Sequence, residues 1–239
     1  MDTIFLFSII VLIASILQTS TGFGFSIMAT PFLLLLFEPR EAIQINLILS
    51  LIISISLIMK IKKDIDMGIL KRFIIGSLVG LPIGISVFLM MDMKVLKLGV
   101  SVLILALTLL LILKFRIGQT SKRNLVVGVF SGAFTTSIGM PGPPILLYFS
   151  GTGTAKEKLR GTTLAFYLWI YFASLLVQVF FAGTSKEIWV SSAMALPIVI
   201  IGLVMGQFLF RWISQNLFRK LTYVLLLFTG IYLFVQQIQ

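Results

Sequence analysis

Two long apolar stretches of this 239-residue chain are broken by clusters of Gly, Ser, Thr and Pro, once in each half. The first cluster lies at 18–26 and the second at 131–144. Hydrocarbon offers no hydrogen-bond partner, so an unwound backbone at membrane depth is tolerated only where protein or a water-lined cavity covers it. Paired breaks at matching positions of two halves are the best sequence indication of a secondary transporter's binding site. We therefore expect the functional centre to lie where the two breaks meet.

The composition predicts a chain whose solvent is the lipid bilayer. It is 59% hydrophobic with a mean hydropathy of +1.12, and only 11% of its residues are charged. The net charge of +11 is carried by Lys and Arg in short loops, where such residues set topology, so no nucleic-acid partner is expected. The sequence has no Cys and no His, which removes disulfides, imidazole chemistry and most transition-metal sites. No cofactor is expected.

The apolar runs predict the helices. Because roughly 20 apolar residues cross a bilayer as a helix, we expect transmembrane spans at 41–60, 68–90, 94–114, 158–181, 187–210 and 216–236. Two regions remain, 3–37 and 123–150, and each contains one of the breaks. As one helix, 3–37 would be about 52 Å long at about 1.5 Å per residue, too long for a single crossing. Each of these regions therefore predicts a helical hairpin.

The two halves of the chain match each other. Gly80 aligns with Gly202 at an offset of 122 residues, and Pro31 aligns with Pro144 at an offset of 113. The offset grows only across loops, as an old duplication with loop insertions produces. The predicted fold is an all-α polytopic membrane protein of two repeats, each a broken helical hairpin followed by three transmembrane helices. The predicted repeats are 1–116 and 117–239.

The distribution of Lys and Arg predicts the orientation. If each broken region crosses the membrane an even number of times, one side holds 15 of the 19 Lys and Arg residues, in the loops 60–72, 114–123, 154–160 and 211–220. A single crossing by each region would split them 10 to 9. The positive-inside rule selects the first arrangement. Both termini are then expected outside the cytoplasm, and the repeats are inverted relative to each other, as in many secondary transporters.

The second break resembles that of the TauE/SafE family of membrane proteins, also called the sulfite exporter family. The residues that carry the resemblance are Ser131, Gly132, Gly139, Pro141, Gly142, Pro143, Pro144 and the following Ile145 to Tyr148. The first break is a looser match, because Phe23 and Phe25 stand where the family usually has small residues. The resemblance covers nearly the whole chain. It implies transport, commonly export, of small sulfur-containing anions such as sulfite or organosulfonates, and with the size of the chain it implies a bacterial inner membrane.

The groups at the breaks suit an anion. No Asp, Glu, Lys or Arg lies mid-span, whereas a proton relay or a cation site would normally place an acid there. Half-helices that begin after each break would direct unsatisfied N–H donors and a positive dipole end at the gap. The predicted substrate-binding residues are Gln18, Thr19, Ser20, Thr21, Gly22, Gly24, Ser26, Pro31, Thr135, Thr136, Ser137, Gly139, Pro141, Gly142 and Pro143. The residues expected behind them are Gln44, Asn46, Arg160 and Thr163.

Export also follows from the electrical gradient. The membrane potential, negative inside, drives an anion outward by about 2.3 kcal/mol per charge per 100 mV, so an exporter needs no coupling ion. The expected partners are a small anionic substrate and the lipid bilayer, and no oligomeric state is predicted.

Several alternatives stay open at this point. A channel for small anions and a non-transporting scaffold subunit are the competing functions. An enzyme is not expected, because a hydroxyl nucleophile here has no His or buried carboxylate to activate it. Ser and Thr at the breaks either contact the ligand or hydrogen-bond their own helices. A second set of glycines is expected to serve close helix packing, namely Gly76, Gly80, Gly84, Gly202 and Gly206.

Overall fold

The computed structural model describes residues 2–90 and 118–212, with scattered positions in 98–113 and 214–235. The eight α-helices in these residues are α1 (Asp2–Thr21), α2 (Phe25–Leu36), α3 (Pro39–Ile61), α4 (Met67–Met90), α6 (Ser121–Ile138), α7 (Gly142–Thr152), α8 (Lys156–Ala182) and α9 (Lys186–Trp212). A short 3₁₀ turn, Lys62–Asp64, joins α3 to α4. Five helices are long and apolar enough to cross a bilayer, namely α1, α3, α4, α8 and α9. The prediction of an all-α polytopic membrane protein is confirmed. The predicted spans 94–114 and 216–236 lie, apart from scattered positions, outside the described residues.

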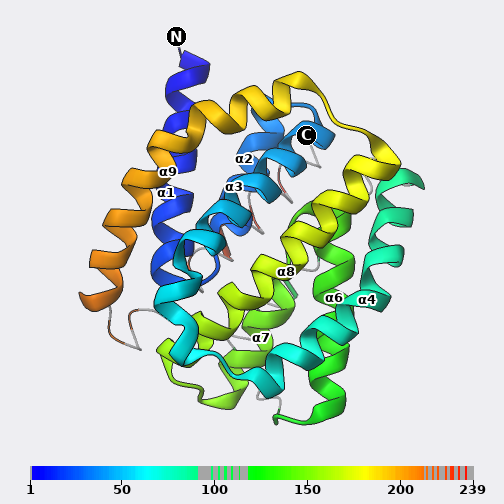
Figure 1. Ribbon diagram of the computed structural model, residues 1–239, viewed down its shortest axis with the longest axis vertical. Helices are drawn as coiled ribbons and strands as arrows, with labels where there is room; N and C mark the ends of the chain where they lie inside the picture. Colours follow the sequence, from blue (N-terminus) through cyan, green and yellow to red (C-terminus); the bar gives the residue numbers. More distant parts are fainter. Residues whose placement is uncertain are drawn as a thin grey trace.

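The helices pack in pairs that relate the two halves of the chain. Helices α3 and α8 pack against each other, α4 packs along α6, and α9 packs along α1 (Figure 1). In chain order, α1 to α4 of the first half correspond to α6 to α9 of the second half. The α4–α6 contact of one half with the other is therefore equivalent to the α9–α1 contact, and the α3–α8 contact is equivalent to itself. The same correspondence relates the contact of α4 with α8 to that of α9 with α3. This pairing agrees with the predicted repeats, but the repeats, their inversion and their boundary at 116/117 stay predictions.

Side-chain contacts show which segments share an end of the molecule. The rings of Phe7 and Phe37 lie 5.4 Å apart, so the start of α1 lies beside the end of α2. The Ser185 hydroxyl donates to Glu41 at 3.1 Å, which brings the start of α9 to the start of α3. At the other end of α3, Lys60 Nζ donates to Gln207 Oε1 at 2.5 Å. The N-terminus therefore shares an end with the 37–41 turn and the 183–187 turn. Which end faces the cytoplasm stays a prediction from the charge count.

Glycines allow the close approach of these helix pairs. A Cβ built on Gly76 would lie 2.1 Å from the Leu125 carbonyl oxygen of α6, and one on Gly80 would lie 2.1 Å from that of Val129. Similar close contacts are made by Gly84 to Ala133 in the same pair and by Gly202 to Ser15 and Gly206 to Thr19 between α9 and α1. The prediction that these five glycines serve helix packing is confirmed.

The glycine contacts predict a stability defect for Gly76→Ala. The added methyl group meets backbone, which cannot rotate away, so α4 and α6 must separate. We expect a loss of about 1–3 kcal/mol from overpacking, although Ala has the better helix propensity by up to about 1 kcal/mol. The measurement is thermal unfolding in detergent, where each kcal/mol shifts the midpoint by about 2–4 °C for a chain of this size.

The matched control is Gly68→Ala in the first turn of the same helix. There a Cβ would meet only the end of one side chain, the Asp66 carboxylate at 3.3 Å, and no backbone. The control should unfold at the wild-type temperature. Wild-type stability of Gly76→Ala would contradict the α4–α6 packing.

Candidate functional site

The first break separates α1 from α2. Helix α1 ends at Thr21, and Gly22 and Gly24 have positive φ angles of 86° and 118°. Residues that have a Cβ rarely adopt this backbone conformation. The first hydrogen bond of α2 runs from Met28 N–H to Gly24 O at 3.0 Å. The N–H groups of Phe25 and Ser26 therefore have no partner within their own helix and point back toward the break.

The second break separates α6 from α7. Helix α6 ends at Ile138, and Gly139 follows in the left-handed region with φ 73°, the usual end of a helix in a glycine. Helix α7 begins at Gly142, and Pro143 and Pro144 occupy its first turn. Proline has no N–H, so Gly142 supplies the one N–H group among the first three residues of α7.

The fold brings the two breaks together. Helices α2 and α7 contact each other, and a Cβ built on Gly142 would lie 3.0 Å from Ile27 Cδ1 in the first turn of α2. The junction is inside the protein, because the polar residues of both breaks are buried, namely Gln18, Thr19, Ser20, Thr21, Ser26, Thr135, Thr136 and Ser137. The starts of both half-helices thus face a common interior region.

Most hydroxyls at the breaks are occupied by their own helices. Ser20 donates to Ile16 O at 2.7 Å, Thr21 to Leu17 O at 2.6 Å, Thr135 to Ser131 O at 2.5 Å and Ser137 to Ala133 O at 2.7 Å. Thr136 bonds Gly132 O at 3.0 Å and the Ser174 hydroxyl of α8 at 2.8 Å. In this arrangement these protons are not available to a ligand. The donors left at the breaks are backbone N–H groups, hydroxyls from other helices and the buried hydroxyl of Thr19, which has no hydrogen-bond partner among the described residues.

Other predicted site residues hold the helices together. Gln18 Nε2 donates to Ser50 O at 2.9 Å and to the Ser54 hydroxyl at 3.3 Å, which ties the end of α1 to α3. Pro31 lies buried in the middle of α2, about two turns from the junction. Pro141 is the residue that precedes the first turn of α7.

Two of the residues expected behind the site contact the breaks, each from the opposite half of the chain. Asn46 of α3 donates from Nδ2 to Gly139 O at 2.8 Å, at the second break. Arg160 of α8 donates from Nε to Thr19 O at 2.7 Å, at the first break, and a Cβ built on Gly22 would lie 2.8 Å from its Cα. Only 8% of Arg160 is exposed, and its guanidinium lies 4.3 Å from the Phe210 ring centroid.

The other two do not make such contacts. Gln44 donates from Nε2 to Gly183 O at 2.8 Å, at the end of α8 and away from the breaks. Thr163 is buried, and its hydroxyl has no hydrogen-bond partner among the residues that the structure describes.

One face of α8 contributes residues that the prediction did not include. Gln178 donates from Nε2 to Thr136 O at 2.7 Å, and the Tyr171 hydroxyl donates to Ser26 Oγ at 3.3 Å. Tyr167 is buried one turn before Tyr171. With Ser174, these side chains recur at spacings of three and four residues, the period of one helix face. This stripe of polar residues inside an apolar span is the sequence pattern from which these four residues could have been predicted.

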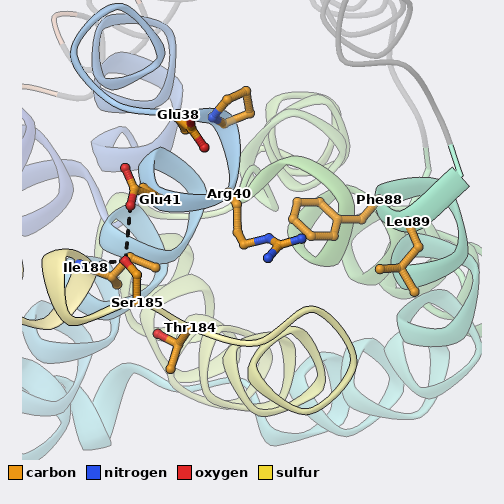
Figure 2. A pocket seen from close by; sticks show the side chains of 9 residues that line it. Glu38, Arg40, Glu41, Phe88, Leu89, Thr184, Ser185 and Ile188 are labelled. Carbon is orange, nitrogen blue, oxygen red and sulfur yellow. Dashed lines mark hydrogen bonds between the residues drawn. The ribbon is translucent and has the colours of Figure 1, made fainter.

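A cavity lies at each end of the α3–α8 pair. The first, of about 510 Å³, is lined at the start of α3 by Glu38 to Glu41, at the end of α4 by Phe88 and Leu89, and by Thr184, Ser185 and Ile188. Figure 2 shows Arg40 extending from α3 into this cavity toward Phe88. The second, of about 600 Å³, is lined by 63–67 and by Ala155, Glu157 and Lys158 at the start of α8.

The two cavities occupy corresponding places in the two halves. The segment 38–41 of the first cavity matches 155–158 of the second at an offset of 117 residues. In the second cavity, Lys158 Nζ lies 2.8 Å from Asp66 Oδ2 and lowers the pKa of that carboxyl below its usual range. The same carboxylate accepts the N–H groups of Gly68 and Ile69, each at 3.0 Å, so it caps the start of α4.

Broken hairpins that meet inside a helical membrane protein are the architecture of membrane transporters. The chain belongs to the sulfite exporter TauE/SafE family, whose model matches residues 7–233. This is a family of transporters, not of enzymes. No curated protein and no solved structure matches the chain.

The contact of Asn46 with the second break predicts a stability defect for Asn46→Ala. The substitution leaves the Gly139 carbonyl without its side-chain partner in a buried position, which costs about 1–3 kcal/mol. The measurement is the thermal unfolding midpoint in detergent, with Ser56→Ala as the control on the same helix. Ser56 is exposed and donates only to Ile52 O at 2.8 Å, so its loss should have little effect. Equal stability of the two variants would mean that Asn46 does not support the break.

Proposed function

We propose that this protein exports a small sulfur-containing anion, such as sulfite or an organosulfonate, and binds it between the starts of α2 and α7. The observation that carries the proposal is the buried meeting of two half-helix starts, with Gly142 of α7 against Ile27 of α2. Family membership supports an exporter of sulfur anions. The finer assignment of site and substrate rests on the electrostatics of the junction.

The junction is electrostatically positive. Each helix start carries roughly half a positive charge, and α2 adds the N–H groups of Phe25 and Ser26. Arg160 brings a full positive charge to the first break and forms no ion pair in the part of the chain that the structure describes. The described carboxylates lie in or next to turns at the two ends of the molecule. A buried region with positive ends and several donors favours an oxyanion over a cation or an apolar solute.

The cavities supply entry on both sides in this proposal. They lie at opposite ends of α3 and α8, and the breaks lie between them. In an inverted-repeat transporter, movement of one half against the other opens the central site to each side in turn. The correspondence of 38–41 with 155–158 gives the two entrances equivalent positions in the halves. Arg40 in the first cavity would attract anions at that end.

Export requires no coupling ion. An anion leaving a cell with a negative interior gains about 2.3 kcal/mol per charge per 100 mV. Uptake would need a site for a proton or a metal ion, and among the described residues no carboxylate lies at the junction.

The test is counterflow in proteoliposomes with labelled sulfite, thiosulfate, sulfate, taurine and sulfoacetate, with and without an imposed potential. We expect saturable flux of at least one of them, accelerated by the same anion on the far side and by a potential that drives negative charge outward. Flux without this trans-stimulation would indicate a channel. Absence of flux for every sulfur anion would overturn the proposed substrate class.

The site assignment predicts that Gly142→Ala loses transport. The new methyl group would meet the ends of two side chains, Ile27 Cδ1 at 3.0 Å and Tyr167 Oη at 3.1 Å, and it would shield the Gly142 N–H from an approaching oxyanion. A hydrogen bond to a charged group is worth about 1.5–3 kcal/mol, so counterflow at low substrate should fall by about tenfold or more.

The substitution also adds a Cβ immediately before Pro143, which disfavours the helical conformation of residue 142. The size-exclusion profile of the variant therefore checks that it still folds. Gly68→Ala, also in the first turn of a helix, is the matched control and should transport normally. Normal flux through a folded Gly142→Ala protein would show that the substrate does not bind at the start of α7.

A further inference from the structure

The hydroxyl of Tyr167 is an unexplained polar group in the interior. The side chain is 0% exposed, and its oxygen has no hydrogen-bond partner among the described residues. Leaving a buried donor unpaired costs about 1–3 kcal/mol, so each such group in a folded protein needs an explanation. Tyrosine hydroxyls in particular usually find a partner when buried.

The position of this hydroxyl points to the junction of the breaks. Tyr167 Oη lies 3.1 Å from the place that a Cβ on Gly142 would occupy, and Ile27 Cδ1 lies 3.0 Å from the same place. The hydroxyl is therefore held against the first residue of α7, beside the first turn of α2. A helix start and an unpaired buried donor aimed at it are two independent observations at one location.

Helix α7 lacks the donors that a helix start normally offers. A helix presents the N–H groups of its first residues to a bound anion, but Pro143 and Pro144 have none. Gly142 keeps one donor. The start of α2 has no proline, so the half-helices differ in their donors although both direct a positive end at the junction. A phenol beside Gly142 supplies a second donor at the poorer of the two starts.

The ring of Tyr167 is well placed for this role because its neighbour fixes it. The rings of Tyr167 and Tyr171 pack edge to face at 5.0 Å, and the Tyr171 hydroxyl is already engaged with Ser26. Two χ angles define the position of a tyrosine oxygen, so little freedom is lost when it binds a ligand.

We infer that the Tyr167 hydroxyl donates a hydrogen bond to the transported anion and, with the Gly142 N–H, forms an oxyanion subsite at the start of α7. This inference rests on the proposed function and names one contact of the same site. The ligand class is a small oxyanion with several acceptor oxygens, one directed at α7 and Tyr167 and another at the N–H groups of α2.

The test is Tyr167→Phe, which removes the hydroxyl and keeps the ring. Two readouts are needed, the unfolding temperature without substrate and the half-saturating concentration for counterflow. Removing an unpaired hydroxyl does not lower stability, so the unfolding temperature should stay the same or rise. Loss of a hydrogen bond to a charged group should raise the half-saturating concentration by about 10- to 100-fold.

Tyr148→Phe is the matched control. Its phenol is also fully buried, but it lies further along α7 and donates to Asn124 Oδ1. This variant should be less stable than the wild type and keep the wild-type half-saturating concentration, the reverse of the result for Tyr167→Phe.

The anion panel separates failure of this inference from failure of the proposed function. It contains the four sulfur anions above, the zwitterionic sulfonate taurine, and nitrate, phosphate and formate. If the wild type transports a sulfur anion and Tyr167→Phe does so with unchanged half-saturation, the Tyr167 contact is overturned and the proposed function stands. If only a non-sulfur oxyanion is transported and its half-saturation rises in Tyr167→Phe, the subsite is supported and the sulfur substrate is overturned. If the wild type transports none of the anions, both are overturned.

Discussion

The structure depends on how a membrane protein satisfies an unwound backbone. At membrane depth the N–H and C=O groups freed at Gly22–Gly24 and Gly139–Pro141 find no partner in lipid. The fold places both breaks in its interior, where α3 and α8 supply hydrogen-bond partners to them. Close packing through glycines at the α4–α6 and α9–α1 contacts brings the outer helices near enough to cover them. The position of the proposed site therefore follows from the need to bury the breaks.

The partners of each break come from the opposite half of the chain. Asn46 of the first half holds Gly139 O, and Arg160 of the second half holds Thr19 O. A shift of one half relative to the other would lengthen these bonds, so the shape of each break is tied to the relative position of the halves. A transporter that opens to alternate sides needs such a link between its binding groups and its moving parts. In the proposed mechanism, Asn46 and Arg160 provide this link through their bonds to Gly139 O and Thr19 O.

The sequence was enough to predict the features that depend on hydropathy and backbone chemistry. It was not enough to predict which neighbours a polar side chain contacts in the folded protein. Long runs of apolar residues predict membrane helices wherever they occur, and the predicted all-α membrane fold was correct. Gly76 and Gly206 were correctly assigned to helix packing, because a stripe of small residues has few other uses in membrane helices. The hydroxyls of Ser20 and Thr135 could equally have faced a ligand or their own helix, and only the packing decides between these. The partner of Gln44, at Gly183 O, is 139 residues away in the sequence, and no local pattern indicates it.

The two proposed half-sites are not equivalent, although the helices of the two halves follow the same order in the sequence. The offset of 117 residues matches Tyr167 and Tyr171 of α8 with Ser50 and Ser54 of α3. Those serines lie beside Gln18, whereas the tyrosines reach the starts of α7 and α2. Prolines remove N–H donors from α7 and leave those of α2 in place. In the proposed site, a ligand meets the N–H groups of Phe25 and Ser26 on one side and the Gly142 N–H with the Tyr167 phenol on the other. In a site with exact two-fold symmetry, an asymmetric anion such as an organosulfonate would bind equally well in two orientations. The unequal donors remove that degeneracy, so duplication followed by divergence of α8 can turn two equal half-sites into one oriented site.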